Sequence, residues 1–169
     1  MVAKMVELRK GKMSEEDCRA ALSKGNYFGT MLVKMGKADA LLGGATYSTA
    51  DTVRPALQLI KTKPGAHLVS SCFILVREKD GAEEKLAMGD CAINIDYPDS
   101  KDKEGNVTLK GSQKLAEVAI ETANTAKAFG IDPKVAVLSF STKGSGKGGT
   151  VALSREATEY AKEMNPELA

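Results

Sequence analysis

The sequence predicts a layered α/β/α domain with a mixed sheet. Apolar runs of strand length alternate along the chain with longer segments that carry an apolar stripe at helical spacing. Two of the apolar runs, Leu68–Val76 and Leu86–Ile95, are close enough in sequence to pair as an antiparallel hairpin, which makes the expected sheet mixed. The sequence contains no internal repeat and no low-complexity linker.

Composition places the chain among ordinary globular proteins and excludes several classes of function. The 169 residues suffice for one domain with a core, and 43% are hydrophobic and 27% charged. The net charge of +2, the absence of a long basic run and the 5% aromatic content argue against nucleic-acid or membrane-surface binding. No apolar run is long enough to span a membrane, and the charged N-terminus does not resemble a signal peptide.

Cysteine and histidine usage indicates a reducing, cytoplasmic setting without a metal centre. The three cysteines are Cys18, Cys72 and Cys91, an odd number without paired spacing, so we expect free thiols that pack as small apolar groups. The single histidine, His67, and the lack of a C-x-x-C pair leave no credible zinc or iron site.

Two helices are expected before residue 37. Ser14 is a good N-cap for a helix that carries Cys18, Ala21 and Leu22 on one side, and the acidic residues 15–17 suit its positive end. A second helix follows Gly25, with Phe28, Met31, Leu32 and Met35 on one face, which we interpret as core.

The segment Ala38–Lys61 reads as a strand, a glycine turn and a helix, and the rest of the prediction centres on it. Ala38–Leu42 has strand length, Gly43–Gly44 allows a tight turn, and Asp51 is a candidate cap for the helix that follows. Such a turn directs backbone N–H groups and the positive helix end at an anion, to which the Arg54 guanidinium could add two parallel hydrogen bonds. The alternative is that Arg54 is a solvated helix arginine.

Pro55 complicates the start of this helix. Proline disfavours the α conformation of the residue before it, here Arg54. Either the helix begins at Arg54–Pro55 or its first turn is distorted, and both alternatives leave Arg54 close to the anion-binding end.

The remainder of the chain alternates strands and helices. The apolar run Leu68–Val76 is expected to be a strand buried on both faces, and a polar connection at 79–84 joins it to its partner. A short hairpin at Asn106–Leu109 is expected within the polar loop of residues 96–111. The clearest helix spans Leu115–Phe129 and stops at Gly130. A buried strand at Val135–Leu138 and a last helix from Leu153 to Met164 complete the pattern.

A glycine-rich loop after Leu138 is a second candidate phosphate site. Residues 141–149 contain four glycines and two lysines between the expected strand and helix. A Walker A loop needs Ser or Thr after the lysine, whereas Lys147 is followed by Gly148. The loop also lacks the downstream acidic residue of a dinucleotide fold, so a flexible surface loop remains an alternative.

Several segments resemble the phosphate acetyltransferase (phosphotransacetylase) family, in the same order and over about residues 5–169. The longest is 41–58, LLGGATYSTADTVRPALQ, and the second is 138–145, LSFSTKGS. Shorter matches are ELRK at 7–10, YFGTML at 27–32 and GDCAIN at 89–94.

The resemblance implies reversible acetyl transfer between acetyl phosphate and coenzyme A, with coenzyme A as a substrate and with no bound cofactor or metal. It implies two α/β domains like those of isocitrate and isopropylmalate dehydrogenases, with residues 1–64 in the first and 65–169 in the second.

The family's phosphate-binding arginines match Arg9 and Arg54. Ser48, Thr49 and Thr52 lie in the matching turn and are expected to bind the same phosphate. The expected wall of the coenzyme A cleft consists of Ser141, Thr142, Lys143, Gly144 and Ser145.

The chain departs from the family in length. The resemblance places the base for the coenzyme A thiol on an aspartate after a C-terminal Ser-Arg-Gly motif, and these 169 residues contain no such motif. We therefore expect a fragment with little or no turnover, whose exposed sheet edges favour a homodimer or another form of self-association. The loop Ser100–Leu109 resembles an insertion.

The alternatives to acetyl transfer are a non-catalytic phosphate or coenzyme A binding module, including a regulatory domain of a larger enzyme, and an acyltransferase of the phosphate butyryltransferase type.

Overall fold

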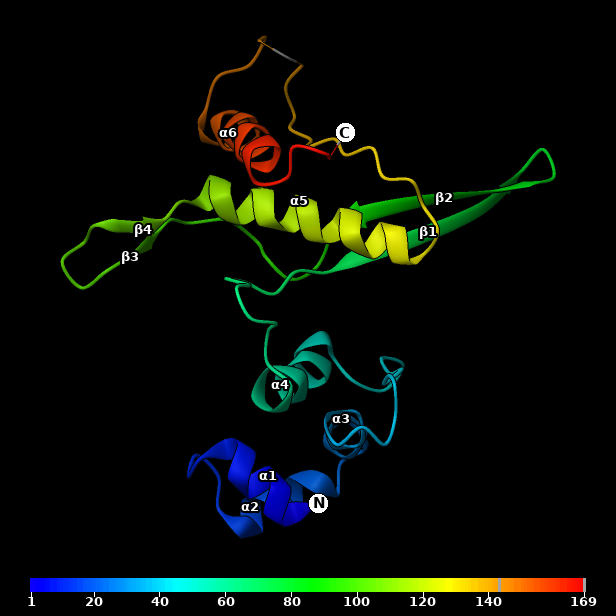
Figure 1. The fold of residues 1–169 in the computed structure, drawn as a ribbon, viewed down its shortest axis with the longest axis vertical. Coiled ribbons are helices and arrows are strands. Elements are labelled where there is room, and N and C mark those ends of the chain that lie inside the picture. The colour runs from blue at the N-terminus through cyan, green and yellow to red at the C-terminus, as the bar shows by residue number, and fades with distance from the viewer. Residues whose placement is uncertain (143, 169) are drawn as a thin grey trace. The chain divides into compact units, whose positions relative to one another are not determined.

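The chain divides into two compact units, Met1–Gly65 and Ala66–Ala169. The structure is a computed structural model that describes residues 1–142 and 144–168. Each unit is described by itself. The first contains helices α1 to α4, and the second contains strands β1 to β4 with helices α5 and α6 (Figure 1).

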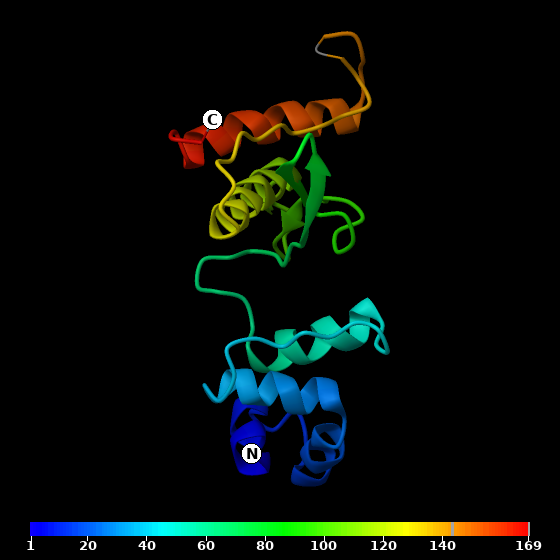
Figure 2. The ribbon, with the colours of Figure 1, turned by 90° about the vertical axis from the view of Figure 1, so that its right-hand side faces the viewer.

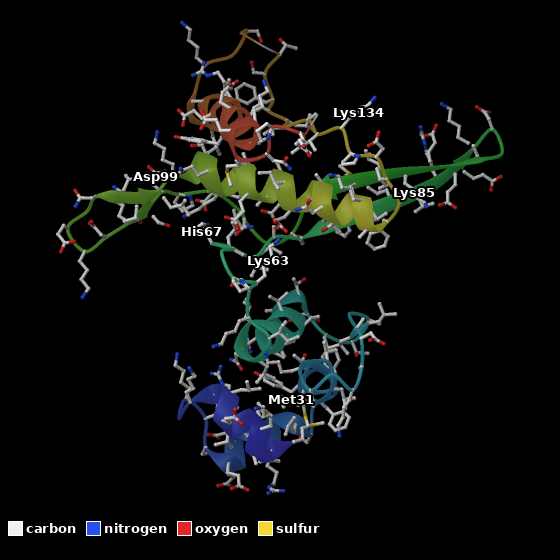
Figure 3. All side chains as sticks on the ribbon, in the orientation of Figure 1. Met31, Lys63, His67, Lys85, Asp99 and Lys134 are labelled. Atoms are coloured by element: carbon white, nitrogen blue, oxygen red, sulfur yellow. The ribbon has the colours of Figure 1, made fainter. Side chains whose placement is uncertain are left out.

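The first unit is a cluster of four helices. Its elements are α1 (Val2–Arg9), α2 (Glu15–Leu22), α3 (Gly25–Lys34) and α4 (Thr49–Leu59). Each helix packs against the next one in the chain, and α1 also packs against α4 (Figure 2). Met31 of α3 lies between these helices (Figure 3). The core of the unit consists of Met5, Cys18, Ala21, Met31 and Leu59.

The helices at 15–22 and 25–34 confirm the predictions from spacing, whereas one helix of this unit was not predicted and two predictions are wrong. Residues 2–9, for which the sequence indicated no element, form α1. Ala38–Leu42 is not a strand, and the Leu42 side chain is 99% exposed. A strand needs a neighbour for its backbone hydrogen bonds, and the described residues of this unit contain none. The cap of α4 is Ser48 instead of Asp51, so α4 begins at Thr49.

The second unit is built around the long helix α5 (Gly111–Ala128), which packs against a β-hairpin and against α6 (Gly149–Met164) (Figure 1). The hairpin joins β1 (Cys72–Lys79) to β2 (Ala82–Gly89) in antiparallel register, from Cys72 opposite Gly89 to Lys79 opposite Ala82. Asp80 and Gly81 form its two-residue turn, both with positive φ, as a tight hairpin turn requires. This pairing confirms the expected antiparallel hairpin.

A smaller hairpin and the two helices complete the second unit. β3 (Ser100–Lys101) pairs antiparallel with β4 (Val107–Leu109), which confirms the short hairpin expected before α5. Asp99 lies where this hairpin meets α5 (Figure 3), and its carboxylate accepts a 2.7 Å hydrogen bond from the Gly111 N–H at the start of that helix. Small buried side chains allow α5 and α6 to approach closely. They are Ala116, Ala119, Ala123, Ala126, Ala157 and Ala161.

The α/β class is confirmed, but the layered mixed sheet is not found in the described residues. The two sheets are separate two-stranded antiparallel pairs. Val135–Leu138 carries no strand, and Leu138 is 80% exposed. The apolar run at 68–76 is not buried on both faces, since its strand begins only at Cys72 and Phe73 is 57% exposed. Continuous apolar sequence indicates that a segment can be buried, but burial requires elements on both faces, and α5 covers one face of this hairpin.

Candidate functional site

The N-terminus of α4 is held by a network of short side-chain hydrogen bonds. The Ser48 hydroxyl accepts from the Asp51 N–H at 3.1 Å and donates to the Asp51 carboxylate at 2.7 Å. The Thr52 hydroxyl donates to the Ser48 carbonyl at 3.1 Å. Thr49 is exposed as the first residue of the helix. Ser48 and Thr52, which were predicted to bind phosphate, therefore also stabilise the first turn of α4.

Arg54 lies on the exposed side of α4. Its side chain is 59% exposed, and one of its terminal nitrogens is 3.9 Å from the Asp51 carboxylate. An ion pair at this distance and exposure contributes little to stability, so the guanidinium can leave Asp51 for a stronger anionic partner at small cost. A phosphate is such a partner, because its oxygens match the planar fork of donors on arginine.

α4 continues through Pro55, unlike either alternative expected from the sequence. The helix spans Thr49–Leu59, so Arg54 and Pro55 lie in its interior and the first turn is helical. Pro55 is fully buried. The Asn26 side chain of α3 reaches α4 here and donates to the Asp51 carbonyl at 2.6 Å.

Arg9 reaches the same helix one turn later. It is the last residue of α1, and its Nη1 donates to the Gln58 carbonyl of α4 at 3.3 Å. The Tyr27 hydroxyl of α3 donates to the Gln58 side chain at 2.9 Å, so three helices meet at Gln58. Gln58 follows Arg54 by four residues, which is about 6 Å along the helix axis. The Arg9 Nε is buried without a hydrogen-bond partner among the described residues.

The predicted cleft loop belongs to the second unit and forms a closed hydroxyl cluster. The Thr142 and Ser145 hydroxyls are 2.6 Å apart, and the Ser141 hydroxyl is 3.2 Å from that of Ser145. The Ser145 N–H donates to the Thr142 carbonyl at 3.0 Å, and Gly144 has a φ of 84° that favours glycine in the turn. Lys143 lies outside the described residues.

The segment that begins at Gly89 forms a second polar cluster in this unit. The Asp90 carboxylate accepts hydrogen bonds from the Tyr97 hydroxyl and from the Asn94 side-chain amide, the latter at 2.6 Å. The same amide donates to the Val69 carbonyl at 3.0 Å. Burial and then the hydrogen bond to Asp90 raise the pKa of Tyr97 above its ordinary value. These bonds shape the turn after β2 and engage the side chains of Asp90, Asn94 and Tyr97 with one another.

The described residues offer no other candidate centre. No group of three or more His, Cys, Asp or Glu side chains among them is arranged to hold a metal ion. A shallow pocket of the second unit is lined by Glu83, Lys85, Gly130 and Ile131, none of them a predicted site residue; Figure 3 labels Lys85. No described helix is both long and apolar enough to cross a membrane.

The structure therefore gathers five predicted residues around α4. Arg54, Ser48, Thr49 and Thr52 belong to the helix or its cap, and Arg9 contacts its later half. Convergence of the two guanidiniums on one phosphate remains a prediction. Sequence analysis assigned no role to Asn26 or Gln58. A signal for Asn26 existed, because a proline inside a helix leaves the carbonyl four residues earlier without its N–H partner.

Comparison with known proteins links the whole chain to one family. The profile described as phosphate acetyl/butaryl transferase matches residues 1–169. A phosphate acetyltransferase from Bacillus subtilis (strain 168) is 54% identical over 168 residues, which are 99% of this chain and 47% of that protein. A curated phosphate acetyltransferase from Staphylococcus aureus (strain Mu50 / ATCC 700699) is 48% identical over 99% of this chain and 46% of its own length.

Comparison with solved structures links the chain to the same family. The crystal structure of a phosphotransacetylase from Streptococcus pyogenes matches with a TM-score of 0.81 and 52% identity, over 100% of this chain and 47% of that one. The EutD phosphotransacetylase from Staphylococcus aureus matches with a TM-score of 0.75 and 49% identity, over 98% of this chain and 45% of that one. The chain thus spans about half the length of the relatives it matches.

Proposed function

Because the chain belongs to the phosphate acetyl/butaryl transferase family, we propose that it carries the phosphate-binding part of an enzyme that transfers an acetyl group reversibly between acetyl phosphate and coenzyme A. The observation that carries the proposal is the placement of Arg54. Arg54 lies between the two ends of a serine-capped helix, and its guanidinium is exposed. The guanidinium has only a loose contact with Asp51. Arg9 is held against the same helix by Gln58.

The proposed chemistry needs positive charge at the leaving group. The thiolate sulfur of coenzyme A attacks the acetyl carbonyl carbon, a C–S bond forms, and the bond between that carbon and the phosphate oxygen breaks. The electron pair of the broken bond stays on the departing phosphate, where the guanidiniums of Arg9 and Arg54 stabilise it. The hydroxyls of Ser48, Thr49 and Thr52 are close to the same helix end and could donate to the phosphate, with Ser48 and Thr52 exchanging their present hydrogen bonds.

The loop of the second unit is proposed as a contact for coenzyme A. Thr142 and Ser145 are exposed and Ser141 is half-buried, and their three hydroxyls suit phosphate oxygens as hydrogen-bond donors. The base for the thiol is expected outside these 169 residues, so we propose that the chain alone binds substrate but turns it over slowly or not at all.

Acetyl phosphate binding by the 169-residue chain tests the phosphate site. Arg54→Ala should weaken binding about tenfold or more, because it removes charge-assisted hydrogen bonds. Arg19→Ala is the matched control, since Arg19 is also an exposed helical arginine that pairs with a carboxylate, Glu15 at 3.0 Å. Isothermal titration calorimetry gives both affinities. Equal losses in the two variants, or no binding by the parent chain, would contradict the proposal.

A non-catalytic phosphate or coenzyme A binding module is the second candidate. It is favoured because the exposed Arg54 guanidinium and the capped end of α4 suit anion binding without the help of a base. Formation of acetyl-CoA from acetyl phosphate and coenzyme A separates the two candidates. Turnover with butyryl phosphate in place of acetyl phosphate decides between the acetyl and butyryl types.

We also propose a cytoplasmic location and self-association, as a homodimer or otherwise. The described thiols of Cys18, Cys72 and Cys91 are free, as a reducing compartment favours. One face of the β1–β2 hairpin exposes Phe73, Leu75, Leu86 and Met88, and such apolar surface favours association. Sedimentation velocity over a range of concentrations measures the oligomeric state, and Leu75→Lys should weaken any assembly that uses this face.

A further inference from the structure

Pro55 interrupts the hydrogen bonding of α4 at the turn that carries Arg54. Proline has no N–H, so the carbonyl of Asp51, four residues earlier, loses its helical donor. Proline also disfavours the α conformation of the preceding residue, which is Arg54. Without compensation, this turn is the weakest point of the helix, and it is the turn from which the Arg54 side chain projects.

The Asn26 side chain supplies the missing donor. Its Nδ2 donates to the Asp51 carbonyl at 2.6 Å, and the residue is only 7% exposed. Its Oδ1 accepts from the Tyr27 N–H at 2.9 Å, which fixes the amide so that the nitrogen faces α4. The Thr30 hydroxyl, in a residue that is 2% exposed, donates to the Asn26 carbonyl at 2.7 Å. Asn26 is therefore held rigidly on α3.

We propose that Asn26 is a positioning residue for Arg54. By replacing the N–H that Pro55 lacks, it keeps the Asp51–Pro55 turn helical and thereby sets the direction in which the Arg54 guanidinium leaves the helix. The same turn carries the Asp51 carboxylate, 3.9 Å from that guanidinium. The inference rests on the proposed function only in assigning phosphate binding to Arg54, since the placement of Arg54 can be measured without ligand.

A double-mutant cycle tests the inference with Asn26→Ala, Pro55→Ala and the double variant of the 169-residue chain. Pro55→Ala restores a backbone N–H for the Asp51 carbonyl, so Asn26 should matter only when Pro55 is present. The first readout is the NMR signal of the Arg54 Nε–H, assigned by its loss in Arg54→Lys. The second readout is affinity for acetyl phosphate.

We expect Asn26→Ala to displace the Arg54 signal and to weaken acetyl phosphate binding about fivefold, the usual effect of one lost hydrogen bond. In the Pro55→Ala background, Asn26→Ala should change neither the Arg54 signal nor the affinity for acetyl phosphate. Asn124→Ala, at an exposed position of α5, is the control and should have no effect on either readout.

Two results would overturn the inference. One is an Arg54 signal that stays unchanged in folded Asn26→Ala. The other is a displacement that is as large in the Pro55→Ala background as with Pro55 present. If Asn26→Ala does not fold, the comparison of Pro55→Ala with the double variant still decides. An Arg54 signal that differs between these two proteins contradicts the inference, and one that is the same in both supports it. Loss of the proposed function would show instead as equal acetyl phosphate affinity of the parent chain and Arg54→Ala.

Discussion

The two units of the chain differ in the size of the side chains that form their cores. The first buries Met5, Met31 and Leu59 almost completely among its four helices. The second buries mainly alanines between α5 and α6, whereas Phe73, Leu75, Leu86 and Met88 of its hairpin are each 44 to 60% exposed. The first unit therefore obtains its core from its own helices, whereas the hairpin of the second unit has one covered face and one open face.

The largest expected effect comes from truncating the core of the first unit. Leu59→Ala removes a side chain that is 1% exposed and should lower the free energy of unfolding by about 2 to 5 kcal/mol, because a cavity adds to the lost burial. Leu75→Ala, at a residue that is 47% exposed, should cost under about 1 kcal/mol. Urea titration followed by far-ultraviolet circular dichroism measures both. Equal costs would remove the distinction between the units.

A smaller effect is expected where α5 begins. A Cβ at Gly111 would lie 1.8 Å from the Tyr97 carbonyl oxygen, so Gly111→Ala must shift backbone and should cost about 1 to 3 kcal/mol. Gly149 also opens a helix of the second unit, but a Cβ there meets nothing within 4 Å. Gly149→Ala should therefore be neutral or stabilise by up to about 1 kcal/mol. A loss in Gly149→Ala equal to that in Gly111→Ala would argue against crowding as the cause.

The smallest effect concerns the helix caps, which also differ between the units. Ser14 and Ser48 cap α2 and α4 of the first unit with their hydroxyls, whereas Gly148, which precedes α6, has no side chain to do so. Ser14→Ala should lower the free energy of unfolding by about 1 kcal/mol at neutral pH, because the Asp17 N–H loses its acceptor. Urea titrations of the variant and the parent chain check this difference.

The effect of Ser14→Ala should also depend on pH. Hydrogen bonds from the Ser14 side chain and backbone hold the pKa of Asp17 below its ordinary value. A carboxylate with a depressed folded pKa stabilises above its unfolded pKa, and this contribution is lost as the pH falls through the folded value. The pH-dependent part of the difference between the two proteins should therefore shrink in acid. If the difference in free energy of unfolding between the parent chain and Ser14→Ala stays constant as the pH is lowered, Asp17 is not involved.

Local sequence was sufficient for α2, α3 and α5 and for the family. Ser14 and the acidic residues after it mark the start of α2, and the apolar stripe from Leu115 with the stop at Gly130 marks α5. The motif at 41–58 pointed to the family that the comparisons show. These features depend on residues within a few turns of one another, so spacing alone encodes them.

Strands and side-chain partners were less predictable. The apolar segments 38–42 and 135–138 have strand-like composition, but a strand exists only if another segment supplies its backbone hydrogen bonds. The site shows the same limit. Sequence selected Arg54 and Arg9 through a resemblance, but their neighbours Asn26 and Gln58 come from contacts between helices that are distant in the chain.

Cap residues, glycine stops and apolar stripes were thus enough to place α2, α3 and α5, because each signal acts within one or two turns. Only the packing of α3 against α4 decided that the helix runs through Pro55, since the donor that replaces the missing N–H comes from a residue 25 positions away. Only the packing of α5 decided which face of the hairpin is covered. Both outcomes depend on which surfaces meet, and no local spacing contains that information.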